Sequence, residues 1–173
     1  MGCSVSKDLF LAIEQRDTKQ TKRILSSTET QCQYALNQDG LPPICVAAKL
    51  GYDDIIVLLL EHGFTAHVPD DRCWFPVHYA AKNDQCDVIY VLVNRGQADV
   101  TKRCPVDACK CEKSTALHAA AQHGSYNAAK TLVQCGIDVT TLNHRGQTAQ
   151  QVAEELGHDD VAELLRRSAK ILQ

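Results

Sequence analysis

The sequence has neither an excess of basic residues nor a long apolar segment. Its 173 residues include 18 Lys and Arg against 21 Asp and Glu, a formal net charge of -3. Binding to nucleic acid phosphates calls for a clear basic excess, so nucleic acid is not expected as a partner. The longest apolar run covers only residues 55–60, whereas a membrane-spanning helix needs about 20 residues. No segment is therefore expected to cross a bilayer.

Signals for secretion and for catalysis are also missing. The apolar segment at residues 9–13 is interrupted by Glu14 and is too short for the core of a signal peptide. The nine cysteines are an odd number, and we interpret them as reduced thiols of a cytosolic protein. The chain contains no P-loop, no dinucleotide-binding glycine cluster, and no G-x-S-x-G or H-E-x-x-H motif. The sequence therefore predicts no enzyme, no cofactor and no small-molecule substrate.

A spacing of 33 residues recurs along the chain. Similar segments at residues 43–48, 75–81 and 115–121 each open a helical pattern that a glycine closes, and two of these glycines, Gly63 and Gly96, are 33 residues apart. A period of this size indicates an array of small units that stack into one continuous core. Such an array presents an open surface, so binding is expected rather than chemistry.

Each unit is expected to be a turn followed by two antiparallel helices. In residues 39–48 a glycine, which tolerates positive φ, precedes prolines that are accepted in a first helical turn. Ala47 and Ala48 are small and let a neighbouring helix pack closely. A second, strongly apolar helix is predicted at residues 53–61, and Gly63 ends it.

These segments resemble the ankyrin repeat, whose pattern runs D-x-x-G-x-T-P-L-H-x-A-A-x-x-G-H and later L-L-x-x-G-A-D. The matching residues of the third and fourth units are Pro76, His78, Ala80, Ala81, Leu92, Gly96, Ala98, Asp99, Thr115, Leu117, His118, Ala120, Gly124, Leu132, Gly136 and Asp138. The resemblance implies an all-α solenoid of about five helix-turn-helix units. It also implies that His78 and His118 hold turns together through backbone hydrogen bonds.

The units are expected at residues 8–36, 37–69, 70–102, 110–142 and 143–173, after an N-terminal segment at residues 1–7. The first unit lacks the turn motif, and the last replaces apolar residues by Gln150 and Gln151, as a solvent-facing cap requires. Other positions depart from the family pattern. Cys45 and Gln151 replace a histidine, and Cys73 and Asp84 replace a glycine.

One insertion interrupts the period. His78 and His118 are 40 residues apart, which places about seven extra residues at 102–112, in the turn before the fourth unit. Insertions in repeat arrays loop out on one face, often the binding face.

The insertion crowds three thiols together, those of Cys104, Cys109 and Cys111. Zinc could use them with a fourth ligand, for which Cys73 is the best placed and His144 a poorer one. The spacing lacks the paired C-x2-C knuckles of ordinary zinc modules, and thiols beside basic residues can instead be reactive or redox-sensitive. An ordinary binding loop is the leading interpretation, and the alternatives are metal binding and redox or acylation chemistry of the thiols.

The chain starts with Met-Gly-Cys-Ser-Val-Ser-Lys, which fits the M-G-x-x-x-[ST] pattern for N-myristoylation of Gly2. One myristoyl chain binds membranes only marginally, and palmitoylation of Cys3 would supply a second anchor. The arrangement resembles the start of Src-family kinases and other dually acylated peripheral membrane proteins. It predicts attachment to the cytoplasmic face of a plasma membrane or endomembrane, with a cytosolic pool.

Basic side chains follow closely, at Arg16, Lys19, Lys22 and Arg23. They would add attraction to an anionic leaflet, which Glu14 and Asp17 partly offset. A solvated helix face is the simpler interpretation of these charges taken alone.

The resemblance places a protein partner on a concave strip of turns and first-helix ends. Carried over to this chain, the strip contains Leu41, Lys49, Leu50, Arg72, Trp74, Lys82, Asn83, Ser114, Gln122, His123 and Gln147. Arg72 and Trp74 are the expected hot spot, because Arg and aromatic side chains dominate interface energetics. The alternative is that Trp74 folds back over the insertion as local packing.

The leading functional hypothesis is a non-enzymatic scaffold or regulator, monomeric by itself and tethered to a membrane by acylation. One alternative is a soluble ankyrin adaptor or inhibitor subunit. Another is a metal or redox sensor built on the cysteine-rich insertion.

Overall fold

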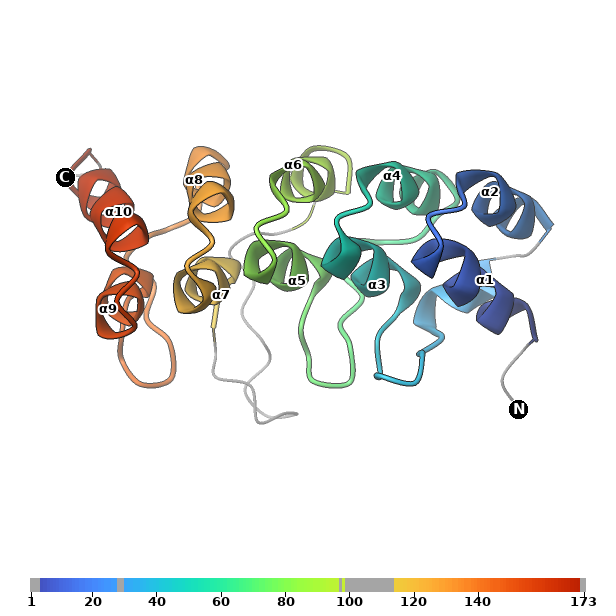
Figure 1. Cartoon of the computed structure of the whole chain (residues 1–173), viewed down its shortest axis with the longest axis horizontal. Coiled ribbons are helices and arrows are strands. Elements are labelled where there is room, and N and C mark those ends of the chain that lie inside the picture. Colours follow the sequence, from blue (N-terminus) through green and yellow to red (C-terminus); the bar gives the residue numbers. More distant parts are fainter. Residues whose placement is uncertain (1–3, 28–29, 97, 99–113, 172–173) are drawn as a thin grey trace.

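The chain folds into a row of paired helices (Figure 1). The computed structural model describes residues 4–27, 30–96, 98 and 114–171. Its helices are α1 (Ser4–Glu14), α2 (Thr18–Ser27), the short 3-10 helix η1 (Thr30–Tyr34), α3 (Pro43–Leu50), α4 (Asp53–Glu61), α5 (Pro76–Lys82), α6 (Cys86–Asn94), α7 (Ala116–His123), α8 (Tyr126–Gln134), α9 (Ala149–Glu155) and α10 (Asp159–Ile171). Within these ranges the backbone forms no strand. The predicted all-α solenoid of about five units is confirmed.

The helices form two layers. The odd-numbered helices stack in chain order in one layer, and the even-numbered helices α2 to α10 stack in the other (Figure 1). The turns before α3, α5 and α9 project beyond the odd-numbered layer. We call these turns the second, third and fifth fingers, at residues 37–42, 70–75 and 143–148. The fourth finger, with the insertion at 102–112, lies mostly outside the described residues.

Buried apolar residues recur with the period of the units. Leu59, Leu92, Leu132 and Leu165 lie in the even-numbered helices and are at most 1% exposed. Burying each leucine side chain contributes about 2 kcal/mol. The facing odd-numbered helices carry fully buried alanines, such as the pair at residues 47–48, whose short side chains permit close packing. Each unit therefore completes its core only against its neighbours, as a repeat array requires.

Asp84 adopts a backbone conformation that glycine supplies in other units. Gly51 and Gly124, which follow α3 and α7, have φ angles of 79° and 68°, and Asp84 follows α5 with a φ of 56°. The left-handed region is tolerated better by Asp than by most residues. Its carboxylate accepts hydrogen bonds from the N–H of Ala128, at 2.6 Å, and the side chain of Asn127, at 2.8 Å. Asp84 thus caps α8 of the next unit, an interaction that glycine could not make.

The first helix begins earlier than the sequence indicated. α1 starts at Ser4, inside the segment 1–7 that was assigned to lipidation. Gly2 and Cys3 themselves lie outside the described residues. None of the helices in the described ranges has both the length and the apolar character that a bilayer span requires.

Candidate protein-binding surface

An Asn or Asp side chain shapes each described finger. Oδ1 of Asn37 accepts hydrogen bonds from the N–H groups of Asp39 and Leu41, both at 2.9 Å. Asp70 and Asn143 accept from the amides two and four residues later in the same way, at distances between 2.6 and 3.0 Å. These bonds keep the finger backbone in one shape. The 33-residue spacing between Asn37 and Asp70 was the signal in the sequence that would have predicted this.

Histidines of the odd-numbered helices tie neighbouring units together. Nδ1 of His78 accepts from the N–H of Phe75, at 3.3 Å, so Nε2 carries the hydrogen and donates to the carbonyl of Ser114, at 3.2 Å. His118 repeats this arrangement, with Nε2 3.0 Å from the carbonyl of Gln147. Burial lowers the pKa of His78 to about 4, so its ring is neutral at physiological pH. Both histidines are structural, as the family resemblance implied.

Cys45 occupies the histidine position of the second unit and makes a weaker form of the same link. Its Sγ lies 3.7 Å from the carbonyl oxygen of Val68 and 4.0 Å from that of Trp74. Burial, with a smaller contribution from the Asp70 carboxylate, raises the pKa of the thiol well above its usual value. The protonated thiol is therefore the hydrogen-bond donor here.

Trp74 packs within its own unit. Its ring centroid lies 5.4 Å from that of Tyr79 and 5.8 Å from that of His78. The hydroxyl of Tyr79 donates to Oδ2 of Asp70, the residue that shapes this finger. Trp74 is half-buried, so part of its area stabilises the third unit and only the remainder is available to a partner.

The structure corrects one residue of the predicted strip. Leu41 is 4% exposed and belongs to the hydrophobic core, because the second finger turns its side chain inward. Leu50 is 38% exposed. The remaining predicted residues are exposed or half-buried on the fingers and odd-numbered helices, namely Lys49, Arg72, Lys82, Asn83, Ser114, Gln122, His123 and Gln147.

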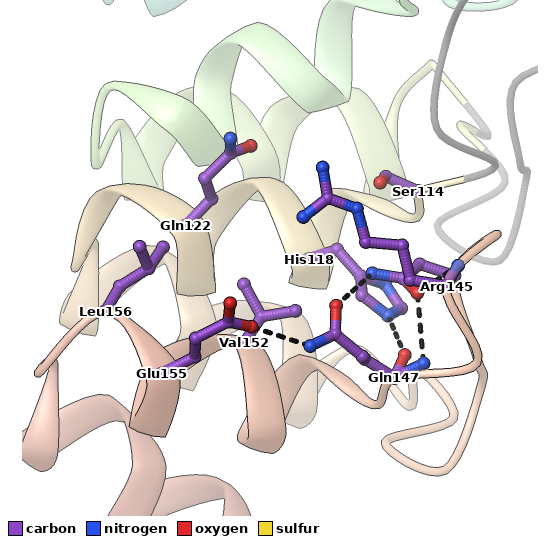
Figure 2. Close-up of a pocket in the computed structure, with 9 residues that line it drawn as sticks. Ser114, His118, Gln122, Arg145, Gln147, Val152, Glu155 and Leu156 are labelled. Atoms are coloured by element: carbon purple, nitrogen blue, oxygen red, sulfur yellow. Dashed lines mark hydrogen bonds between the residues drawn. The ribbon is translucent and has the colours of Figure 1, made fainter.

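Ser114, Gln122 and Gln147 come together around a small cavity of about 100 Å³ between α7, α9 and the fifth finger (Figure 2). The other residues that line it are His118, Asn143, Arg145, Val152, Glu155 and Leu156. We call this cavity and its lining the 114–156 groove. Arg145, Glu155 and Leu156 were not among the predicted residues, because the resemblance carried over only Gln147 from the last unit.

The groove combines charged, polar and apolar groups. Nε2 of Gln147 donates to Oε2 of Glu155, at 2.7 Å, which fixes both side chains against the groove wall. Arg145 projects from the fifth finger in Figure 2, and Leu156 is 51% exposed. Both ring nitrogens of His118 are engaged by structural hydrogen bonds, so it is not placed as a general base. The lining therefore offers charged, polar and apolar side chains side by side.

The described residues offer no set of metal ligands. Within the described ranges, no three His, Cys, Asp or Glu side chains are grouped as a metal ion requires. Cys73 has a φ of 63°, as expected at a position that glycine usually fills. Cys104, Cys109 and Cys111 lie outside the described residues. The metal and redox hypotheses therefore remain predictions.

Comparison with known proteins matches this architecture. A family model described as ankyrin repeats, in three copies, matches residues 9–104 and 100–173. The chain is 28% identical over 154 residues to synphilin-1 of Mus musculus, covering 87% of this chain and 16% of that protein. It is 26% identical over 156 residues to tyrosine-protein kinase HTK16 of Hydra vulgaris, covering 90% of this chain and 20% of that protein. It is 29% identical over 118 residues to B-cell lymphoma 3 protein homolog of Mus musculus, covering 68% of this chain and 25% of that protein. The chain thus spans a quarter or less of the length of these relatives.

Proposed function

The chain belongs to the ankyrin repeat family, whose repeats typically bind protein partners, and we propose that it is a non-enzymatic scaffold or regulator that acylation tethers to the cytoplasmic face of a membrane. Ankyrin repeat domains are generally not catalytic. The partner would bind the strip formed by the fingers and the odd-numbered helices, and the tether would be a myristoyl chain on Gly2 with palmitoyl on Cys3.

The observation that carries the binding role is the 114–156 groove. It joins residues of two successive units, and its lining includes the apolar Leu156 together with the charged Arg145 and Glu155. An interface needs such a mixture, because apolar contact supplies affinity and charged groups select the partner. The open strip also extends over the preceding units, where Leu50 and Trp74 offer further apolar area.

The tether rests on the N-terminal motif. Confinement to a surface raises the effective concentration of a binding module for partners on the same surface, without any new contact. A single myristoyl chain supplies an association constant of only about 10⁴ M⁻¹, so a second acyl chain on Cys3 would be needed for stable attachment. Such a module can regulate a complex through its location at the membrane.

Gly2→Ala tests the tether, because the myristoylation motif requires glycine at position 2. The variant is expected to move from the membrane to the soluble fraction of cells, while Cys3→Ser is expected to leave a weaker, partial membrane association. Fractionation followed by intact mass of the native protein reports location and acyl chains together. Urea unfolding of Gly2→Ala beside wild type shows whether the fold is retained, so that loss of the tether is separated from loss of structure. Unchanged membrane retention of Gly2→Ala would remove the proposed tether and favour a soluble adaptor.

Blocking the groove tests the binding role. The double variant Gln122→Arg and Leu156→Arg adds bulk and positive charge at two exposed lining positions. We expect the amounts of partner recovered by crosslinking in cells to fall about tenfold or more, since hot-spot changes cost about 2 kcal/mol. The matched control is Tyr90→Arg on α6, which is 63% exposed and belongs to the other layer. Equal recovery with the groove variant and the control would contradict this site.

A further inference from the structure

The N-terminal end of the array carries a basic face on α2. This helix has the sequence TKQTKRILSS and contains no acidic residue. Its charged residues are Lys19, Lys22 and Arg23, and all three side chains are exposed. The 114–156 groove lies in the fourth and fifth units, toward the other end of the row (Figure 1).

Helical periodicity directs these charges away from the rest of the molecule. The buried residues of α2 are Thr21, Ile24 and Leu25, which share the face that packs against α1 and α4. With about 3.6 residues per turn, the three basic residues fall on the opposite side of the helix. Lys7 and Leu11 lie on the exposed side of neighbouring α1, and Leu11 is 53% exposed.

Among the described residues, the charges of this face form no ion pair. Arg16, in the turn between α1 and α2, lies 3.8 Å from a carboxylate oxygen of Asp53 and 3.4 Å from one of Asp54. In the part of the chain that the structure describes, Lys19, Lys22 and Arg23 have no carboxylate oxygen within 4.0 Å. The positive charges of α2 are thus available to a binding partner, whereas that of Arg16 is paired with acidic residues of α4.

The local charge is opposite in sign to that of the whole chain. Residues 4–27 contain five basic residues and three acidic ones, whereas the complete sequence has 18 basic against 21 acidic residues. The three acidic residues are Asp8, Glu14 and Asp17, and Oδ1 of Asp17 accepts from the N–H of Gln20, at 2.9 Å, at the start of α2. An anionic surface would therefore attract this end of the array and repel the remainder, which orients the molecule.

We propose that the basic face of α2 docks on an anionic lipid surface, so that the array stands with its N-terminal end on the membrane. The inference rests on the proposed acyl tether, which would enter the bilayer at the same end of the array. Phosphatidylserine headgroups within a Debye length, about 8 Å, attract Lys and Arg side chains. In this orientation the 114–156 groove lies toward the end of the row away from the bilayer and stays accessible to a protein partner.

Vesicle binding of the full chain, acylated at Gly2 and checked by intact mass, tests this docking. One vesicle type is pure phosphatidylcholine, and the other contains about 30 mol % phosphatidylserine. Each basic residue strengthens binding to the anionic vesicles by about fivefold. The triple variant Lys19→Gln, Lys22→Gln and Arg23→Gln is therefore expected to bind anionic vesicles about 100-fold more weakly and neutral vesicles unchanged.

A matched triple variant controls for net charge. Arg95→Gln, Lys130→Gln and Lys170→Gln remove the same charge from exposed positions on later units, and binding is expected to stay within about twofold of wild type. Equal weakening by both triple variants would overturn the α2 face as the docking site. Equal binding of the wild type to both vesicle types would also overturn it, whether or not the acyl chain holds the protein to neutral vesicles. Loss of neutral-vesicle binding in Gly2→Ala reports the tether separately.

The single tryptophan reports the orientation. Trp74 lies in the third unit, away from α1 and α2 along the row. With brominated lipids in the anionic vesicles, its fluorescence is expected to remain unquenched when the array stands on its N-terminal end. Strong quenching would mean that the strip of fingers faces the bilayer, and would overturn the end-on arrangement.

Discussion

Replacing His118 by alanine is expected to lower the free energy of unfolding by about 3 kcal/mol. The residue is 2% exposed. Nδ1 lies 3.3 Å from the backbone nitrogen and 2.9 Å from the hydroxyl of Thr115, and Nε2 lies 3.0 Å from the carbonyl oxygen of Gln147. Removing the ring leaves these groups without their partner, at about 1–3 kcal/mol each, and opens a cavity between α7 and the fifth finger.

The measurement is equilibrium unfolding in urea of His118→Ala and of a second variant, His118→Gln, which places at this position the residue type found in the fifth unit. At the same position of the fifth unit, Oε1 of Gln151 accepts from the N–H of Thr148, at 2.9 Å. His118→Gln should therefore keep the bond within its own finger and lose the link to Gln147, at roughly half the destabilisation of His118→Ala. An exposed histidine, His67, serves as control, and its change to alanine is expected to cost less than about 0.5 kcal/mol. A loss below that value for His118→Ala would contradict the bridging role.

The same variant connects stability to binding. His118 lines the 114–156 groove and holds the carbonyl of Gln147, the residue whose side chain is bonded to Glu155. A fifth finger without this bond no longer has one fixed position relative to α7. We therefore expect His118→Gln to bind the partner more weakly, at temperatures where the variant remains folded. This result would show that binding depends on the contact between the fourth and fifth units.

The sequence predicts most of this fold, because the period, the cap residues and the apolar faces all repeat. The helix pairs, the structural histidines and the glycine-like backbone at Cys73 and Asp84 follow from comparing equivalent positions one period apart. What the carboxylate of Asp84 binds does not follow, since Ala128 and Asn127 belong to the next unit and the intervening insertion breaks the period.

Surface placement was harder to predict than the fold. Leu41 and Trp74 occupy equivalent positions in successive fingers, yet Leu41 is in the core and Trp74 is half-buried against Tyr79. Spacing along the chain predicts where a residue lies within its unit. The size of its side chain and the packing of its neighbours determine how much of that side chain is exposed to solvent. Arg145 and Glu155 could not be predicted as groove residues, because the groove forms only where α7 lies beside the fifth finger and α9 of the next unit.

Acidification is expected to remove about 3 kcal/mol of stability through His78 alone. His78 is 1% exposed, and burial lowers its pKa to about 4, although hydrogen bonds with Ser114 and Phe75 partly oppose that shift. An exposed histidine has a pKa of about 6.5, so between these two values the unfolded chain binds a proton that the native protein does not. Stability is therefore complete above about pH 6.5 and falls by about 1.4 kcal/mol per pH unit toward pH 4.

Urea unfolding of wild type and His78→Gln, from neutral pH down to about pH 4, measures this contribution. Glutamine does not titrate and keeps an acceptor for the N–H of Phe75, so the variant should be less stable than wild type at neutral pH and lose less on acidification. The two stability curves are expected to converge as the pH falls, while the exposed control His67→Gln should run parallel to wild type. Parallel curves for His78→Gln would contradict a neutral, buried ring. Because His78 bonds the carbonyl of Ser114 at the edge of the groove, mild acid should weaken the junction between the third and fourth units.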